Sequence, residues 1–115
     1  MFSIHSEKNY AEILAGIKIK TLVHGDSTLM SEFQLKKGSA LPAHTHPYEQ
    51  TGYLVSGKLD LHIGADHQVL LPGASWCVHS NIEHRAEVLE DSVAIEVFSP
   101  KREDYIKFLD LEAVR

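Results

Sequence analysis

Three histidines have the residue type and the spacing of ligands to one metal ion. His44 and His46 are two residues apart, and His84 follows 40 residues after His44. On a β-strand, a spacing of two places both side chains on one face, where two imidazoles can share an ion. The fold would have to bring His84 to them. Nitrogen ligands of this kind, completed by oxygen, suit one divalent transition metal such as Zn, Ni, Fe, Mn or Co.

The expected oxygen ligand is Gln50, which has the same parity as the two neighbouring histidines if Pro47 leaves the register intact. Glu49 is the rival, but it has the opposite parity and would need a bulge after Pro47 to reach the ion. A neutral amide leaves the positive charge of the ion uncancelled, whereas a carboxylate would cancel part of it. The ion would therefore be a stronger Lewis acid and attract anionic oxygen more strongly.

Short β-prone segments separated by turn residues must position these side chains. They fall at residues 17–25, 29–35, 50–55, 59–63, 68–71, 75–78, 84–89 and 93–98. Many short strands at close intervals predict an all-β sandwich or barrel. Residues 3–15 predict a helical turn or an extended arm, and the segment YIKFLDL near the C-terminus predicts a short helix.

The last predicted strand carries a carboxylate among apolar residues. Glu96 shares one face with Ala94 and Phe98, and both faces of this strand look partly buried. A buried carboxylate without a partner is costly. Two alternatives remain open: Glu96 points to solvent, or it lies in the metal pocket, where Arg102 or the pocket itself satisfies it.

Other side chains have less specific interpretations. Tyr48 has the parity of the histidines and is expected at the pocket mouth or in the core. We expect Trp76 and Tyr53 in the core or at a dimer interface, and Cys77 to be buried rather than reactive. The remaining histidines are interpreted as surface residues: His5, His24, His62 and His67. His79 either lines the rim of the site or is a surface residue, and we favour the surface.

The composition excludes several classes of protein. The chain has 115 residues, a net charge of -5 and a pI near 5.9, which predicts about one domain and no nucleic-acid partner. An anionic ligand must then be held locally, by a metal or an Arg. One cysteine fits a reducing compartment. Neither a signal peptide nor an apolar stretch of the ~20 residues that span a membrane is visible, so we expect a cytoplasmic protein.

The spacing of the histidines and glycines resembles that of the cupin family. The first cupin motif is matched by Gly38, His44, His46, Gln50 and Gly57, and the second by Gly73, His79, Asn81 and His84. Gln50 stands where the first motif usually has Glu. His79 and Asn81 stand where the second usually has Pro and Gly, but Asn tolerates a positive φ better than most residues. The closing Asn of the motif falls at Val88.

This resemblance implies an all-β, RmlC-like fold: the cupin double-stranded β-helix, a jelly-roll barrel, here with a short C-terminal helix. We expect a single cupin domain over residues 1–115 with its barrel core at about 17–99. Small cupins commonly form homodimers through contacts between sheets and exchanged terminal strands. The second face of residues 93–98 and the strand 17–23 fit such an interface.

Two segments resemble the small-cupin subgroup that includes the pectin-degradation cupin. These are HTHPYEQTGYLVSGK, which begins at His44, and the run from Glu96 to Tyr105. Members have an acidic residue, usually Asp, with a Phe and an Arg near the metal. The resemblance therefore implies that Glu96, Phe98 and Arg102 line the site, with Glu96 moving a proton and Arg102 binding an acid group.

Three hypotheses for function follow. The first is an enzyme that isomerises or opens the ring of a small anionic metabolite, such as a keto or unsaturated sugar acid, with Lewis-acid assistance. The second is an Fe(II) dioxygenase, although nothing in the sequence selects iron. The third is a non-catalytic module that binds a metal or a small molecule. Fold alone does not decide among them.

Overall fold

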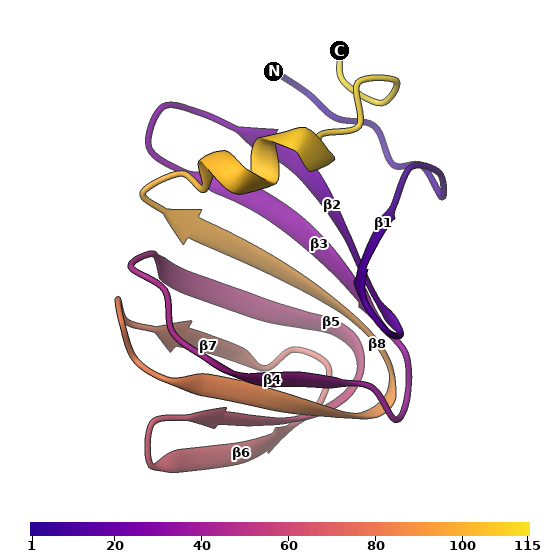
Figure 1. The fold of residues 1–115 in the computed structure, drawn as a ribbon. Helices are drawn as coiled ribbons and strands as arrows, with labels where there is room; N and C mark the ends of the chain where they lie inside the picture. The colour runs from indigo at the N-terminus through magenta and orange to yellow at the C-terminus, as the bar shows by residue number, and fades with distance from the viewer.

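The structure is a computed structural model that describes residues 1–115. It contains eight β-strands followed by one short 3-10 helix (Figure 1). In chain order these are β1 (Ala11–Leu14), β2 (Ile17–His24), β3 (Leu29–Leu35), β4 (Ala40–His44), β5 (Glu49–Ile63), β6 (Asp66–Leu70), β7 (Ser75–Val78), β8 (His84–Ser99) and η1 (Glu103–Phe108). The predicted all-β class and the short C-terminal helix are confirmed.

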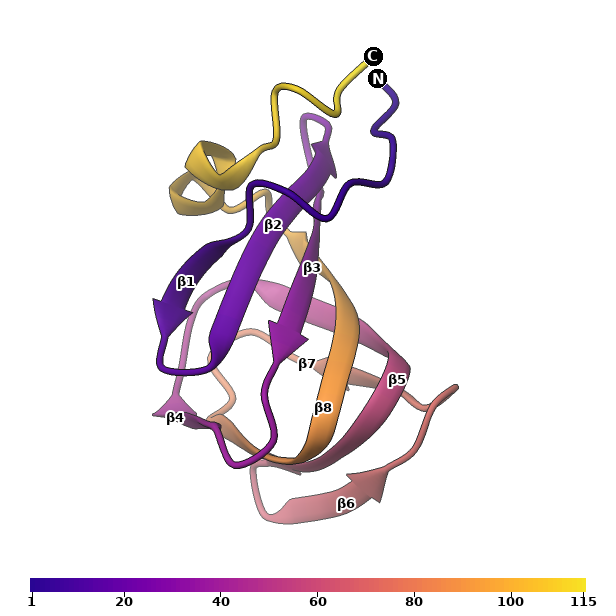
Figure 2. The same cartoon turned by 90° about the vertical axis from the view of Figure 1, so that its right-hand side faces the viewer.

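The two longest strands, β5 and β8, form the frame of the fold. They pair antiparallel with each other in the sheet order β1-β2-β3-β8-β5-β6, while β4 pairs with β8 and β7 with β5. The beginning of β8 pairs with β4 and its end with β3. The beginning of β5 pairs with β7 and its end with β6. The sheet therefore curls around an interior as a jelly-roll barrel (Figures 1 and 2).

The prediction that these long strands are each two separate strands is wrong. The predicted strands 50–55 and 59–63 are parts of β5, and 84–89 and 93–98 are parts of β8. The intervening turn residues bend the strands without ending them. Three register shifts lie between Leu54 and Leu59, which is how a strand bends sharply while its pairing continues.

Gly57 lies at the centre of this bend. Its φ is +94°, a conformation that L side chains rarely adopt. The Ser92 hydroxyl accepts a hydrogen bond from the backbone N–H of Lys58 at 3.0 Å, so it satisfies a donor that the irregular pairing leaves free. The bend is thus made by one glycine on β5 and one serine on β8.

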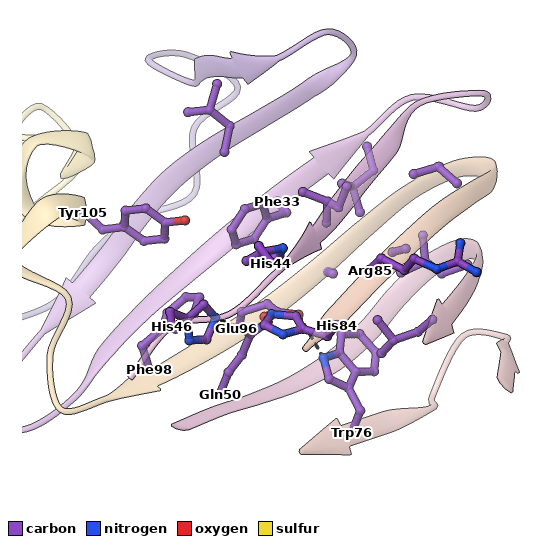
Figure 3. A pocket seen from close by; sticks show the side chains of 18 of the residues that line it. Phe33, His44, His46, Gln50, Trp76, His84, Arg85, Glu96, Phe98 and Tyr105 are labelled. Carbon is purple, nitrogen blue, oxygen red and sulfur yellow. Dashed lines mark hydrogen bonds between the residues drawn. The ribbon is translucent and has the colours of Figure 1, made fainter. Parts of the chain in front are cut away.

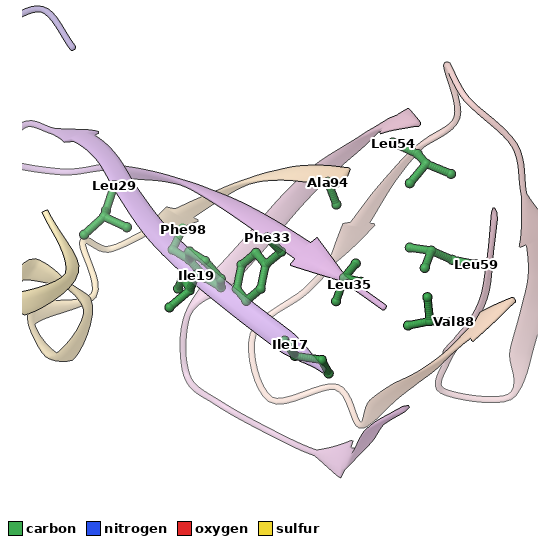
Figure 4. Packing of buried hydrophobic residues seen from close by; sticks show 10 residues of the cluster. All are labelled: Ile17, Ile19, Leu29, Phe33, Leu35, Leu54, Leu59, Val88, Ala94 and Phe98. Carbon is green, nitrogen blue, oxygen red and sulfur yellow. The ribbon is translucent and has the colours of Figure 1, made fainter. Parts of the chain in front are cut away.

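The hydrophobic core fills the space between the two halves of the curled sheet (Figure 4). Alternate residues along each strand point inward, as the period of a half-buried strand requires. Full burial of each large apolar side chain contributes about 1.5–3 kcal/mol. The ten clustered residues are Ile17, Ile19, Leu29, Phe33, Leu35, Leu54, Leu59, Val88, Ala94 and Phe98.

Both terminal segments pack against β2. The first residues are extended, with a bridge from Ser3 to Val114, which selects the extended arm over the helical turn. The ammonium of Lys20 donates to the carbonyl of Ser6 at 2.8 Å and lies 3.4 Å from the buried carboxylate of Asp110. These contacts hold η1 beside the barrel (Figure 2). No helix has the length and apolar character needed to cross a membrane.

We predict that Gly57→Ala destabilises the protein by about 2–4 kcal/mol, because it combines positive-φ strain with a clash. An added Cβ would lie 2.1 Å from the Ser92 hydroxyl oxygen and 2.4 Å from the Asp91 carbonyl oxygen. Urea unfolding measures the change. Gly25→Ala is the control, since nothing lies within 4 Å of its Cβ. Equal stability of both variants and the parent would contradict this account of the bend.

Candidate metal centre

The structure brings the three predicted histidines together from three different positions. His44 is the last residue of β4 and pairs in register with His84, the first residue of β8. His46 lies in the loop between β4 and β5, so the assumption that one strand carries both His44 and His46 is wrong. The ring centroids are 4.1 Å apart for His44 and His84, 4.8 Å for His46 and His84, and 5.6 Å for His44 and His46.

Each of the three imidazoles has its Nδ1 against a backbone carbonyl. The distances are 2.8 Å from His44 to Pro42, 3.0 Å from His46 to Tyr48 and 2.9 Å from His84 to Ile82. A carbonyl only accepts, so Nδ1 carries a proton and donates, and in the neutral ring Nε2 then offers its lone pair. Histidines that bind metals are commonly oriented by a hydrogen bond of this kind.

The Nε2 atoms of the three histidines face one another, and no hydrogen-bond donor lies between them. One ligand atom from each histidine lies within 4.8 Å of the others. The Nε2 of His84 is buried without a hydrogen-bond partner, which is costly unless something else satisfies it. Burial also lowers the pKa of His46 and of His84 below the usual value, which favours the neutral form that a metal requires. These residues fit a divalent metal ion.

Gln50 completes the set, and Glu49 faces away. The Oε1 atom of Gln50 lies 3.0 Å from the Nε2 of His46, while its Nε2 donates to Glu96. Because the Nε2 of His46 and the Oε1 of Gln50 are both acceptors, a cation between them would satisfy both. Glu49 is exposed and contacts Cys77 instead.

Glu96 lies inside the cavity and not in solvent. It is 7% exposed, and burial raises its pKa to about 8, although the hydrogen bond from Trp76 and the charge of Arg102 oppose the shift. Its two oxygens accept from the amide of Gln50 and from the indole N–H of Trp76, the latter at 2.9 Å. Of the two possibilities that the sequence left open, the pocket is the correct one: groups of the pocket donate to this carboxylate, whereas Arg102 does not.

Arg102 lies at the edge of the cavity among aromatic rings. Its guanidinium carbon is 3.6 Å from the ring centroid of Tyr105 and 5.0 Å from those of Tyr48 and Phe98. It donates to both carboxylate oxygens of Asp104, at 2.8 and 3.2 Å. Stacked rings and a bidentate partner hold a guanidinium in one place.

The site opens into a cavity of about 70 Å³, room for several water molecules (Figure 3). Phe98 is on its wall, whereas Tyr48 is not and reaches the site only beside Arg102. The polar and aromatic lining residues include His44, His46, Gln50, Trp76, His84, Arg85, Glu96, Phe98, Arg102 and Tyr105, and the aliphatic ones include Leu35, Leu41, Leu59, Leu61 and Val88.

Sequence reasoning does not place Trp76 or Tyr105 on this wall. The pattern predicts Trp76 in the core or at a dimer interface, but its indole N–H reaches Glu96. Tyr105 begins the predicted terminal helix, and its ring lines the cavity. The parity of Trp76 carries no signal for this contact, because the partner lies on a different strand, 20 residues away.

Two further groups of polar side chains lie outside the cavity, and hydrogen bonds or ion pairs account for both. Asp60 lies 3.3 Å from His62 and 3.4 Å from His67, two residues that the sequence predicts on the surface. Cys77 is exposed rather than buried as expected, and its thiol donates to Glu49. His79 is on the surface, as expected, and Asn81 adopts the Gly-like φ of +65°.

Fold and site together define a cupin. The chain belongs to this family, because the model of the family described as Cupin domain (Cupin_2) matches residues 31–99. The chain is 30% identical over 107 residues to the pectin degradation protein KdgF of Dickeya dadantii (strain 3937), with 91% of this chain and 97% of that protein covered.

Solved structures show the same likeness. KdgF from Halomonas sp. superposes with a TM-score of 0.86 at 28% identity, over 90% of this chain and 98% of the other. An RmlC-like cupin from Shewanella frigidimarina NCIMB 400 superposes with a TM-score of 0.85 at 27% identity, over 90% and 94% of the two chains. The predicted resemblance to a small cupin of the pectin-degradation type is confirmed.

We predict that His84→Ala weakens the binding of a divalent transition metal by about 100-fold or more, beyond the 10- to 100-fold typical of lost outer-shell contacts. Elemental analysis after loading with Mn, Fe, Co, Ni or Zn measures the stoichiometry. His62→Ala is the matched control, since His62 lies in the group outside the cavity. Undiminished metal in His84→Ala, or equal loss in His62→Ala, would contradict the assignment.

Proposed function

We propose that this cupin is a metal-dependent enzyme that isomerises or opens the ring of a small anionic metabolite, most suitably a keto or unsaturated sugar acid. One observation carries the proposal. Four metal-binding groups converge on the floor of a cavity that also contains a buried carboxylate and a fixed guanidinium. Perturbed titratable groups in a cleft are typical of catalytic sites.

The ligands of the metal would be the Nε2 atoms of His44, His46 and His84 and the Oε1 atom of Gln50. When bound, a divalent ion supplies Lewis-acid polarisation of a substrate oxygen. The four ligands are neutral in the tautomers that the structure favours, so they leave the site with a positive field that attracts an anionic substrate. This matters for a chain whose net charge is -5.

Glu96 would move the proton. An isomerisation or ring opening takes a proton from one atom and returns it to another. A carboxyl group with a pKa of about 8 can give and accept a proton near neutral pH. A cation among the histidines would lower this pKa and favour the basic form.

Arg102 would bind the carboxylate of the substrate. Its charge lies at the edge of the cavity, and stacking against Tyr105 fixes its orientation. Asp104 occupies Nε and one terminal nitrogen, which leaves donors on the other terminal nitrogen for a ligand. The distance between Glu96 and Arg102 across the cavity would then set which atom of the substrate receives the proton.

The relatives support this substrate class. This chain matches almost the whole length of both proteins called KdgF. The name of the first assigns it to pectin degradation. Sugar acids are small, anionic and rich in oxygen, which matches a site with a cation and a guanidinium.

We predict that the metal-loaded chain converts unsaturated uronates, and that Arg102→Lys raises KM about 10- to 100-fold while metal content stays unchanged. Lys keeps the charge but loses the fork of donors. Loss of the ultraviolet absorbance of the conjugated double bond measures turnover. Lys107→Arg is the control, because it exchanges the same two basic side chains at a nearby exposed position.

Three outcomes separate the hypotheses. Conversion by the parent, with the expected loss in Arg102→Lys, supports the proposal. Oxygen consumption by the Fe(II) form with catechols, thiols or diketones, without uronate conversion, would replace it with the dioxygenase hypothesis. A stoichiometric metal with neither activity, while a known uronate-converting enzyme works in the same assay, would leave a binding module.

We also propose that the chain forms a homodimer through the outer face of β3, β8 and β5. The register places Met30 beside Val97 and Tyr53 beside Ile95, so each of the three strands contributes apolar side chains to this face. Met30, Tyr53 and Val55 are exposed. Contiguous exposed apolar surface is typical of an interface, and small cupins commonly pair through their sheets.

We predict that Val55→Glu shifts the protein toward the 12.9 kDa monomer, because a buried unpaired charge is costly at an interface. Val69→Glu is the matched control, since Val69 is 50% exposed and Val55 48%, but it lies on β6, away from this face. Sedimentation velocity at micromolar concentration distinguishes the two. A monomeric parent would refute the dimer.

A further inference from the structure

The Gln50 amide depends on a partner to present its oxygen to the histidines. Its two ends have nearly the same shape, but only the oxygen can bind a cation. If the amide rotated by half a turn, its NH2 group would face the imidazole of His46. In the structure the NH2 end donates to Oε2 of Glu96 and Oε1 faces His46. The position of Glu96 therefore decides the orientation of Gln50.

Trp76 holds the other oxygen of Glu96. Its indole N–H donates to Oε1 at 2.9 Å, and Figure 3 shows the ring directed at the carboxylate. The charge of Arg102 acts on Glu96, but its guanidinium is hydrogen-bonded to Asp104 instead. Trp76 and Gln50 are thus the only side-chain hydrogen-bond partners of this carboxylate.

Gly52 makes this contact geometrically feasible. Gly52 lies on β5, between Trp76 on β7 and Glu96 on β8, and it pairs in register with both. An added Cβ at Gly52 would lie 2.2 Å from the indole ring of Trp76, which is far inside van der Waals contact. The ring therefore passes over the strand at the one position without a side chain and reaches the next strand.

We propose that Trp76 is a positioning residue for the metal centre. By holding Glu96 across Gly52, it fixes the Gln50 amide with its oxygen toward His44, His46 and His84. This inference rests on the proposed metal site, and it adds a residue that acts on that site only through Glu96 and Gln50. The alternative is a purely structural role, because the partly buried ring of Trp76 also packs against the core.

A double-mutant cycle on the full chain separates the two roles. Trp76→Phe removes the N–H and keeps most of the ring, and Gln50→Leu removes the amide. Co²⁺ is the probe, and its affinity is measured by calorimetric titration and its ligand set by its visible absorption spectrum. Positioning predicts that Trp76→Phe weakens Co²⁺ binding about 10- to 100-fold in the parent, the range for lost supporting contacts, and changes the spectrum.

The same substitution should have no further effect on affinity in the Gln50→Leu background, because the amide through which it acts is gone. Equal loss of affinity in both backgrounds would assign Trp76 to packing alone and overturn the inference. Unchanged affinity and spectrum in Trp76→Phe would overturn it as well, while leaving the metal site intact. An unmodified chain that binds no Co²⁺ would overturn both the metal site and the inference.

Discussion

The site depends on the hydrogen bonds that three backbone carbonyls accept from the Nδ1 atoms of His44, His46 and His84. They set the tautomer of each ring and its rotation together. With each Nδ1 donating to a carbonyl, the neutral rings offer three lone pairs on the Nε2 side, an arrangement that suits a cation. Burial reinforces this, because it disfavours protonation of His46 and His84. Without these carbonyls, the rings could donate to one another, and the arrangement would no longer favour a metal.

Those carbonyls belong to Pro42 on β4, to Tyr48 just before β5 and to Ile82 just before β8. The pair of bent strands β5 and β8 is the frame that brings these segments together. The bend at Gly57 and Ser92 lets each strand serve both halves of the barrel. One consequence is that the start of β8, with His84, lies beside the end of β4. The end of β8, with Glu96, lies beside the start of β5. The three histidines and the buried carboxylate therefore meet in one cavity, although they are far apart in sequence.

Much of the fold and the composition of the site follow from local patterns. Alternation along the last strand places Glu96 on the same face as Phe98 but leaves open whether Glu96 meets solvent or the cavity. The parity of Gln50 against Glu49 correctly separates the cavity side from the exposed side. Turn propensities locate Gly57 but do not distinguish a bend within a strand from a hairpin. That difference depends on what lies opposite, here Ser92. For this reason the sequence predicts β5 and β8 as two separate strands each.

The partners of charged groups are the part that the sequence does not reveal. Arg102 pairs with Asp104, two residues away, and Glu96 pairs with Trp76 across a glycine on a third strand. Neither choice is visible in periodicity, because each depends on which side chains the folded sheet places within 3 Å or so. Cys77 illustrates the same limit: its alternation is correct, but whether its face is covered depends on the assembly of the barrel.

A crystal structure of the metal-loaded protein, with anomalous diffraction at the absorption edge of the ion, tests the central claim most directly. The account predicts one ion at about 2.0–2.2 Å from the three Nε2 atoms, with the Oε1 atom of Gln50 also bound. It also predicts that every Nδ1 remains on its carbonyl. An ion bound through Nδ1, an ion held only by Asp60, His62 and His67, or no anomalous peak in the cavity would contradict it.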